Sequence, residues 1–355
     1  MWTFESMVGQ PASWLDATGP RSDVVLSTRV RLARNLSGHP FPSRAGVQDL
    51  TMVRDEILGS AAKSNYLTNA LVIRMEEAGP PVRQLLVERH VASPSFGARA
   101  EGRAVIVGEH EVVSAMVNEE DHLRLQSIRS GLQPLDAWRL VSRIDAEVER
   151  NLQYAYSKDW GYLTSCPTNV GTGVRASVLL HLVGLARLGE AAQVLSGISK
   201  LGLSVRGFYG ERSAALGGFF QVSNQTTLGQ SEEDIAYTVE RISSRIVKLE
   251  LQAREKLARE AARRLEDEVW RAHGILTSAR VMSSEEVMSL CSSLRLGVAQ
   301  GIIDDVELGT LNRLLVVTQP GHLKYFHGED PGSEERDRMR ADLVRRELRE
   351  CRREQ

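Results

Sequence analysis

The stretch that decides the fold is Ser27-Thr28-Arg29-Val30-Arg31, near the start of the chain. It lies within residues 23–35, whose alternation and β-branched residues predict a β-strand. Arg29 and Arg31 are two positions apart, so in a strand both side chains point to the same face. Neighbouring guanidinium groups repel each other unless an anion lies between them, and a polyphosphate is the obvious candidate. Taken alone, the pattern is also typical of an exposed edge strand.

Composition is that of a globular chain and excludes several classes of protein. The 355 residues are 42% hydrophobic and 25% charged, and the net charge of −2 does not point to nucleic acid or to an anionic membrane. The chain has neither an apolar run of about 18 residues nor a secretory signal. Its three cysteines, Cys166, Cys291 and Cys351, are too scattered for a disulfide framework or a zinc site. We therefore expect a cytoplasmic protein with reduced thiols.

Apolar patterns predict an α/β region followed by a helical region. One long amphipathic helix is expected from Ile235 to Leu257, where apolar residues recur at helical spacing. Further strands are expected at 85–91, 104–107, 112–118, 161–165, 203–208 and 218–223. Other helices are expected at 48–62, 133–157, 174–199 (broken near Gly189), 283–296 and 304–315. We divide the chain into an N-terminal extension (1–22), a catalytic domain (23–255) and a helical C-terminal domain (256–355).

A second segment with functional potential is Asn118-Glu119-Glu120-Asp121-His122-Leu123-Arg124. Three consecutive acids beside a histidine and an arginine are compatible with a metal site, with an acid/base site or with a solvated loop. The residues alone leave these three interpretations open.

Two further segments combine turn-forming and reactive residues. Cys166-Pro167-Thr168-Asn169-Val170-Gly171-Thr172 predicts a turn that leads into a helix, a junction whose free backbone N–H groups suit anions. It is not a P-loop, because the Gly-Lys-Ser/Thr ending is absent. A cysteine before a proline is more often buried than reactive. Arg206-Gly207-Phe208-Tyr209-Gly210-Glu211 predicts a mobile loop, which by itself is a weak signal.

Together the four segments resemble the phosphagen kinases, a family that includes arginine kinase and creatine kinase. The family's S-T-R-V-R strand, N-E-E-D-H-L-R segment, C-P-T-N-x-G-T signature and R-G-x-x-G-E loop occur here in the same order. The resemblance implies an α+β fold with a large, mostly antiparallel sheet flanked by helices, followed here by an all-helical C-terminal domain. It also implies phosphoryl transfer from ATP to a guanidino group, with Mg²⁺ held mainly by ATP and not by a protein metal site.

The resemblance also implies a role for each matching residue. Glu120 and Glu211 would hold the acceptor guanidinium and accept its proton, because a guanidinium is not nucleophilic while it is cationic. Cys166 would help to orient the acceptor, and His90 would lie beside the nucleotide base. The nucleotide would be bound by Ser27, Thr28, Arg29, Val30, Arg31, Arg124, Arg175, Ala176, Ser177, Val178, Leu179, Arg206, Gly207, Phe208, Tyr209, Gly210 and Glu211.

Two features favour a protein as the acceptor. Small-molecule phosphagen kinases carry a helical N-terminal domain that encloses the acceptor, whereas only about 22 residues precede Asp23 in this chain. Near the C-terminus, Arg336-Asp337-Arg338-Met339-Arg340-Ala341 is similar to the R-D-x-x-R-A motif with which bacterial protein-arginine kinases bind phosphoarginine. The resemblance therefore implies an allosteric phosphoarginine pocket formed by Arg336, Asp337, Arg340 and Ala341.

The same resemblance implies partners that the residues cannot reveal. These are an activator, McsA, a heat-shock repressor, CtsR, and the ClpC–ClpP protease, which would degrade the phosphorylated proteins. A homodimer or a larger assembly is also implied. Two alternatives stay open: a kinase of small guanidino compounds such as free arginine, and a non-catalytic adaptor that binds phosphoarginine. The presence of Glu120, Glu211 and all the matching arginines argues against the adaptor.

Overall fold

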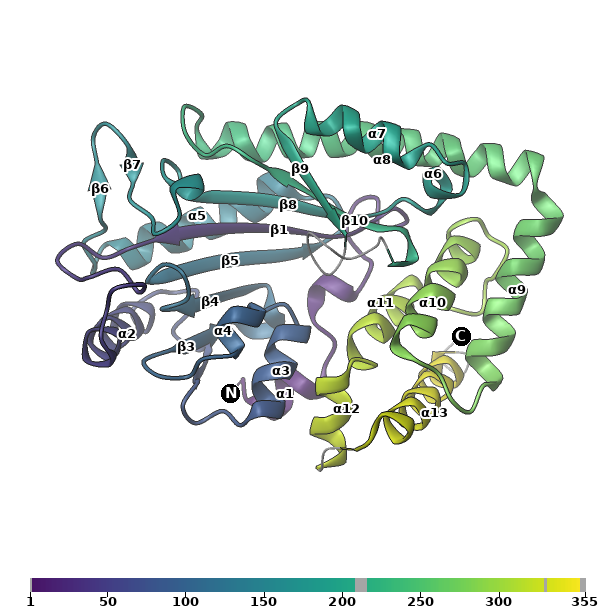
Figure 1. Ribbon diagram of the computed structural model, residues 1–355, viewed down its shortest axis with the longest axis horizontal. Coiled ribbons are helices and arrows are strands. Elements are labelled where there is room, and N and C mark those ends of the chain that lie inside the picture. The colour runs from purple at the N-terminus through teal and green to yellow at the C-terminus, as the bar shows by residue number, and fades with distance from the viewer. Residues whose placement is uncertain (1, 208–215, 329–330, 352–355) are drawn as a thin grey trace.

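The computed structural model describes residues 2–207, 216–328 and 331–351. Within these ranges the main strands form one antiparallel sheet, in the spatial order β2-β3-β4-β5-β1-β8-β10-β9 (Figure 1). A separate hairpin consists of β6 (Tyr156–Ser157) and β7 (Gly161–Tyr162). The strands of the main sheet are β1 (Val25–Arg34), β2 (Leu71–Arg74), β3 (Ala104–Val107), β4 (Val113–Val117), β5 (Leu123–Ser130), β8 (Val174–His181), β9 (Leu203–Gly207) and β10 (Phe219–Asn224).

Helices cover one face of the sheet, called here the helix-covered face. Other helices pack on the opposite face over β3 and β4, and the C-terminal ones continue beyond the end of the sheet as a helical block (Figure 1). In sequence order they are α1 (Phe4–Gly9), α2 (Val47–Ala61), α3 (Pro80–Glu88), α4 (Pro94–Gly97), α5 (Pro134–Glu149), α6 (Val183–Arg187), α7 (Ala191–Ser199), α8 (Glu232–Glu260), α9 (Ala262–Ser278), α10 (Ser284–Ala299), α11 (Leu308–Val317), α12 (Pro320–His327) and α13 (Ser333–Cys351). Buried residues of α5 and α8, such as Ile144 and Val239, share a core with Val30 of β1. In the described ranges, no helix is both long enough and apolar enough to cross a bilayer.

Strand β1 lies in the interior of the sheet, with both of its edges hydrogen-bonded. It pairs with β5 on one side and with β8 on the other. Thr28 and Val30 are fully buried on the helix-covered face, and this alternation turns Arg29 and Arg31 toward the opposite face. The exposed-edge interpretation of this stretch is therefore wrong.

A second apolar core joins the sheet to the C-terminal helices. It includes Trp14 and Leu15 of the N-terminal segment, Phe219 of β10, and residues of α10 and α11 such as Leu294 and Leu314. Each of these five side chains is at most 2% exposed, so the contact is a true core and not a loose docking surface. The C-terminal helices thus pack directly against one end of the sheet.

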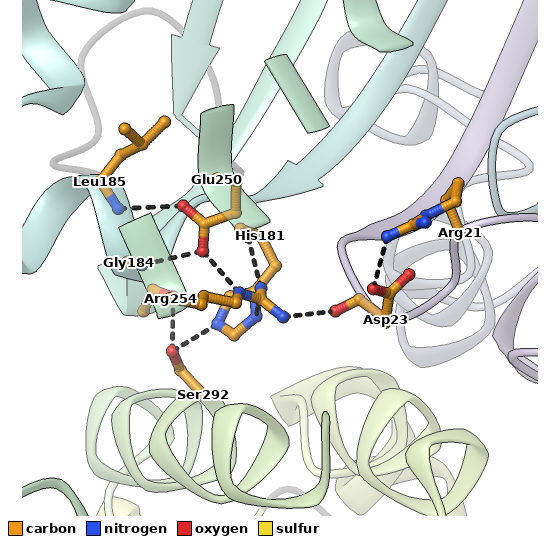
Figure 2. Close-up of polar contacts among 9 residues, drawn as sticks. Arg21, Asp23, His181, Gly184, Leu185, Glu250, Arg254 and Ser292 are labelled. Carbon is orange, nitrogen blue, oxygen red and sulfur yellow. Dashed lines mark hydrogen bonds and ion pairs between the residues drawn. The ribbon is translucent and has the colours of Figure 1, made fainter. Parts of the chain in front are cut away.

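A buried polar network crosses the same junction (Figure 2). Arg254 of α8 donates to Glu250, to the carbonyl of Asp23 and to the carbonyl of His181. The Oγ of Ser292 in α10 donates to the Gly217 carbonyl at 2.6 Å and lies 2.8 Å from His181 Nε2. Ser292 must therefore accept from the Nε2–H of His181. Arg254 Nη2 lies 3.4 Å from His181 Nδ1, which must then accept, so the imidazole is neutral with its proton on Nε2. Burial, with Arg254 next, lowers the pKa of His181 well below its usual value, in agreement with this neutral form.

The predicted fold class is confirmed, with two local corrections. The antiparallel sheet, the long helix α8 and the helical C-terminal region are all present. Residues 85–91 were expected to be a strand, but α3 occupies 80–88, since Pro80 and Pro81 begin a helix readily. Residues 174–181 were expected to be helical but form β8. That run is buried on both faces, and apolar spacing alone does not separate a buried strand from a helix.

Candidate active site

Alternation along β1 and β8 places a row of polar side chains on the face of the sheet away from α5 and α8. On β1, Arg29 and Arg31 line a cavity of about 350 Å³ on this face. On β8, Arg175 lines the same cavity, because it pairs in register with Arg31. Arg206 of β9 also lines it. We call Arg29, Arg31, Arg175 and Arg206 the arginine cluster and this cavity the arginine pocket.

The arginine cluster carries concentrated positive charge. Burial first, and then the nearby Arg124 and Arg175, lower the pKa of Arg29 to about 10. Burial and the neighbouring arginines, Arg29 foremost, also hold the pKa of Arg31 well below its usual value, although Glu119 opposes the shift. The buried Nε of Arg31 has no hydrogen-bond partner among the described residues. A polyanion in the pocket would relieve this repulsion and supply the missing partner.

Arg124 was predicted to join the same set of arginines, but it is already neutralised. It lies on β5 and forms an ion pair with Glu119, which also accepts a hydrogen bond from Ser93 Oγ at 2.6 Å. Burial alone would raise the pKa of Glu119, but Arg124 and Ser93 outweigh it and keep the pKa below its usual value. Glu119 is therefore ionised, and Arg124 reaches an anion only with this carboxylate beside it.

His90 lies where the pocket narrows into a smaller cavity. That cavity is lined by Trp14, Ser27, His90, Ile128, Leu179 and others, and it shares Arg29 and His90 with the arginine pocket. The His90 and Trp14 rings meet edge to face, with centroids 5.3 Å apart. Burial, then Arg29 and Arg31, lower the pKa of His90 to about 3, so the imidazole is neutral. The lining of this smaller cavity is partly apolar and includes the two rings, on which an aromatic base can stack, but at about 30 Å³ the cavity holds only a few waters and would have to widen to admit a base.

Within the acidic segment, Asp121 and His122 have structural roles. Asp121 Oδ1 accepts from Asn35 Nδ2 at 2.7 Å and from the Ser165 amide at 2.6 Å. His122 Nδ1 accepts from the Leu36 amide, so Nε2 carries the proton and donates to the Pro40 carbonyl. Neither residue is available as a metal ligand. Among the described residues, no group of three or more His, Cys, Asp or Glu could hold a metal ion.

Glu120 and Cys166 meet at the surface. The thiol of Cys166 hydrogen-bonds the Glu120 carboxylate and lies 3.0 Å from Thr168 Oγ1. Burial, followed by Asp121 and Glu119, raises the pKa of Glu120, against the opposing effects of Arg124 and Cys166. Glu120 is solvent-exposed, so it is open to a group that arrives from outside. A carboxylate with a raised pKa is suited to accept a proton.

Arg34 fixes the loop that carries Cys166. Its guanidinium donates to the Thr172 carbonyl at 2.8 Å and pairs with Asp145 and Glu232. It also stacks on the Tyr162 ring, 3.6 Å from the centroid. At Gly173, a Cβ would lie 2.5 Å from the Ala33 carbonyl, so only glycine fits against β1 there. The predicted loop is correct in place, but it leads into a strand and not into a helix.

Several predicted nucleotide-binding residues have side chains that point into the core and not into the arginine pocket. Thr28, Val30, Ala176 and Val178 are fully buried on the helix-covered side of the sheet. The predicted residues Phe208, Tyr209, Gly210 and Glu211 lie outside the described residues, whereas Gly207 ends β9.

The C-terminal motif lies on α13, and Arg340 is its most deeply buried charged side chain. Arg340 Nη1 donates to the Met282 carbonyl at 2.9 Å and pairs with Asp337. Arg336 donates to the Pro331 carbonyl at 2.7 Å, and Ala341 is fully buried. Arg340 is thus bound to the surrounding backbone, while Arg336 and Asp337 are only half-buried.

Sequence reasoning missed several residues of the site. Glu119 was grouped with the acids, but its function is to pair with Arg124. Gln221 of β10 lines both cavities, and its position opposite Arg206 could not be known without the pairing of β9 and β10. Leu315, Val316 and Gln319 of the C-terminal region also line the arginine pocket, and no local signal marks them.

The donor set of the pocket suits ATP and leaves Mg²⁺ to the nucleotide. Four arginines line the cavity, and Glu88 is its only carboxylate among the described residues. Mg²⁺ prefers oxygen ligands and often keeps phosphates and waters in its shell. Triphosphate oxygens would satisfy the arginines and hold the metal ion, so the protein would need to provide few metal ligands or none.

The fold and the arginine-lined pocket indicate a phosphotransferase. Residues 53–253 match the family described as ATP:guanido phosphotransferase, C-terminal catalytic domain, and residues 262–355 match the protein-arginine kinase McsB C-terminal domain. The protein-arginine kinase of Desulforamulus reducens is 44% identical over 98% of both chains. That of Symbiobacterium thermophilum is 45% identical over 94% of this chain and 96% of its own.

Solved structures of small-molecule guanidino kinases share the fold. The duplicated taurocyamine kinase from Schistosoma mansoni, with bound transition-state analogue components, superposes with a TM-score of 0.60 at 23% identity, over 68% of this chain and 35% of that chain. A lombricine kinase superposes with a TM-score of 0.59 at 23% identity, over 71% of this chain and 73% of that chain. The chain belongs to the ATP:guanido phosphotransferase family, and within it to the protein-arginine kinases.

Proposed function

We propose that this protein transfers the γ-phosphoryl group of ATP to the guanidino group of arginine side chains in other proteins. The observation that carries the proposal is the arginine cluster, in which Arg29 and Arg31 stand side by side and the buried Nε of Arg31 has no partner among the described residues. A triphosphate matches this charge, and the adjoining cavity beside His90 has a partly apolar lining that would accept a base once the cavity widens.

In the proposed reaction a guanidino nitrogen of the acceptor attacks the γ-phosphorus of ATP. The N–P bond forms while the bond to the bridging oxygen breaks, and ADP leaves. The arginine cluster offsets charge on the phosphate oxygens, and Mg²⁺ bound with ATP would add to this effect. The displaced guanidinium proton goes to a carboxylate, and Glu120 is the described candidate because its pKa is raised and it is exposed. Glu211, the second predicted carboxylate, lies outside the described residues.

The position of Glu120 favours a protein acceptor. Its carboxylate and the Cys166 thiol lie at the surface, where an arginine on another folded protein could reach them. The close relatives are named protein-arginine kinases, which supports the same acceptor.

Offering labelled ATP together with a folded arginine-bearing protein and with free arginine tests the proposal. Acid-labile phosphate on arginines of the protein, detected by mass spectrometry under mild conditions, is the expected result. Transfer to free arginine alone would establish the small-molecule kinase instead. Binding of ATP without transfer to either acceptor would favour the adaptor.

The family resemblance extends the proposal to regulation in the cytoplasm. Phosphoarginine would bind at Arg336 and Asp337 and activate the enzyme, with McsA as activator and with CtsR and substrates of ClpC–ClpP as targets. The double variant Arg336→Ala with Asp337→Ala should lose this activation while ATP binding is kept, because neither residue lines the arginine pocket. Unchanged activation in the double variant would refute the regulatory role.

A further inference from the structure

One wall of the arginine pocket comes from the C-terminal helices. Leu315 and Val316 of α11 and Gln319, just before α12, line the same cavity as the arginine cluster. These residues belong to the segment 262–355, which is separate from the phosphotransferase match at 53–253. A region outside the phosphotransferase domain therefore encloses part of the cavity that would receive the nucleotide.

Besides the shared apolar core, one carboxylate of the sheet domain holds this wall next to the pocket. Glu88, the last residue of α3, accepts from the Gly321 amide at 2.6 Å, from the His322 amide at 3.0 Å and from His322 Nδ1 at 2.9 Å. Both amides are in the first turn of α12, where backbone N–H groups have no partner inside the helix and a negative charge is favoured. The Glu88 side chain is only 11% exposed, so these charge-assisted bonds are shielded from water.

The close approach of α12 to α3 depends on Gly321. A Cβ at this position would lie 2.8 Å from Glu88 Oε2 and 2.9 Å from Gln84 Cγ, closer than packed atoms come. Glycine therefore lets the helix terminus sit directly on the carboxylate.

Gln319 is itself fixed in place. Its Nε2 donates to the Leu315 carbonyl at 3.0 Å, and its Oε1 accepts from Ser284 Oγ at 3.3 Å. The side chain therefore bridges α11 and α10 next to the cavity, as a preformed surface and not as a free chain.

We propose that the C-terminal domain forms part of the ATP site, with Val316 and Gln319 as nucleotide-contacting residues and Glu88 as the positioning residue that holds them there. The inference rests on the proposed function, because it takes the arginine pocket to be the ATP site. Neither Glu120 nor Cys166 lines this cavity among the described residues, so we expect changes in the wall to alter ATP affinity and to leave the proton-accepting carboxylate unaffected.

Glu88→Gln tests the positioning role. Glutamine has the same size, but it loses the charge and turns an NH₂ group toward backbone amides that need an acceptor. The dissociation constant of Mg-ATP, measured by titration calorimetry on the full chain, should rise about tenfold. The KM for ATP should rise in parallel, while kcat at saturating ATP stays the same.

Gln319→Ala provides an independent test, since it leaves the Glu88 contacts intact. It should weaken ATP binding about threefold or more through loss of the wall surface. The matched controls are Glu335→Gln, on the exposed part of α13, and Gln300→Ala, at the end of α10. Neither control residue lines the pocket, and both should bind ATP like the wild type. Thermal melting without nucleotide separates loss of the wall from loss of the fold.

Three outcomes decide whether the C-terminal domain forms part of the ATP site. Weaker ATP binding in both folded variants with unchanged kcat supports the inference. ATP affinity within twofold of wild type in both variants, or a fall in kcat at unchanged affinity, overturns it. A wild-type protein that binds no ATP would overturn the proposed function itself, and this result is distinguishable because it appears before any substitution.

Discussion

Arg340 donates a hydrogen bond from Nε to the backbone carbonyl of Thr318, at 2.9 Å, across the contact between α13 and the end of α11. Thr318 directly precedes Gln319, which lines the arginine pocket. A contact of the C-terminal motif and the wall of the pocket therefore fall on two adjacent residues. Any ligand that changes how Arg340 is held would act on ATP affinity through this short connection, and ATP would act equally on that ligand.

Arg340→Lys should weaken ATP binding by about three- to tenfold, because a lysine ammonium cannot reproduce the planar set of bonds to Thr318 and Met282. Titration calorimetry with Mg-ATP measures the effect. Arg338→Lys on the exposed face of α13 is the matched control. Equal affinities in the two variants would contradict the connection.

Glu120→Gln should reduce kcat for arginine phosphorylation at least about a hundredfold, because the amide cannot accept the guanidinium proton. ATP binding should be unchanged, since Glu120 does not line the arginine pocket. A labelled-phosphate assay with a protein acceptor gives the rate. Glu109→Gln, at an exposed carboxylate elsewhere, should retain full activity. Normal turnover in Glu120→Gln would remove Glu120 from the mechanism.

Arg31→Gln should raise the melting temperature of the nucleotide-free protein by about 2 °C while reducing the further increase that ATP produces. The reason is the same in both cases: Arg31 is held against other guanidinium groups, which is unfavourable until an anion is bound. Thermal melting with and without ATP reads both effects. Arg346→Gln, at an exposed arginine of α13, should change neither. If Arg31→Gln lowered the melting temperature without nucleotide and kept the full increase in melting temperature on adding ATP, this explanation would be wrong.

Because of His122, the free energy of unfolding should decrease in mildly acidic solution. Burial lowers the pKa of His122 from 6.5 to about 4, although its bond to the Pro40 carbonyl opposes the shift. The unfolded chain takes up a proton near pH 6.5 and the folded chain does not. The neutral His122 side chain therefore makes its full contribution to the free energy of unfolding above pH 6.5. As the pH falls from 6.5 toward 4, the free energy of unfolding decreases by up to about 3 kcal/mol.

The check on His122 is urea unfolding across this pH window. His122→Gln should be less stable than wild type at neutral pH but should lose less stability on acidification. His327→Gln, at an exposed histidine of α12, should follow the wild type. Parallel pH curves for His122→Gln and wild type would assign the acid sensitivity to other groups.

Ser292→Ala should lower the free energy of unfolding by about 1–3 kcal/mol, because it leaves His181 Nε2 and the Gly217 carbonyl without their buried partner. Ser289→Ala, on the exposed face of the same helix, should cost almost nothing. Denaturant titration of both variants measures the difference. Equal stabilities would show that water replaces the Ser292 hydroxyl.

Local patterns were enough to predict much of the fold. Alternation and β-branched residues predicted β1, short apolar runs predicted the strands near 104–107 and 112–118, and helical spacing predicted α8, α10 and α11. The strand predicted at 85–91 and the helix predicted over 174–181 were wrong, because a short apolar run does not by itself distinguish a strand from a helix. The boundaries assigned at 22 and 255 stay predictions, although 255 falls inside the continuous helix α8.

The candidate site divides in the same way. The sequence identified Arg29, Arg31 and Arg175 as candidate site residues, and the pairing of β1 with β8 places them in one cavity. It could not bring out Gln319, because a residue nearly three hundred positions from β1 reaches the pocket only through tertiary packing. Likewise, the pairing of Glu119 with Arg124 follows from a turn geometry and not from residue spacing.

The core shared by the two ends of the chain has a consequence for synthesis on the ribosome. Asn312 Nδ2 donates to the Leu15 carbonyl at 3.1 Å, and Arg295 donates to the Ser22 carbonyl, so the first segment translated is completed by nearly the last. Until those helices emerge, Trp14 and Phe219 lack the apolar cover that the C-terminal helices supply. We therefore expect the nascent chain to expose this part of its hydrophobic surface until its last third is made, which favours contact with chaperones that bind emerging polypeptides.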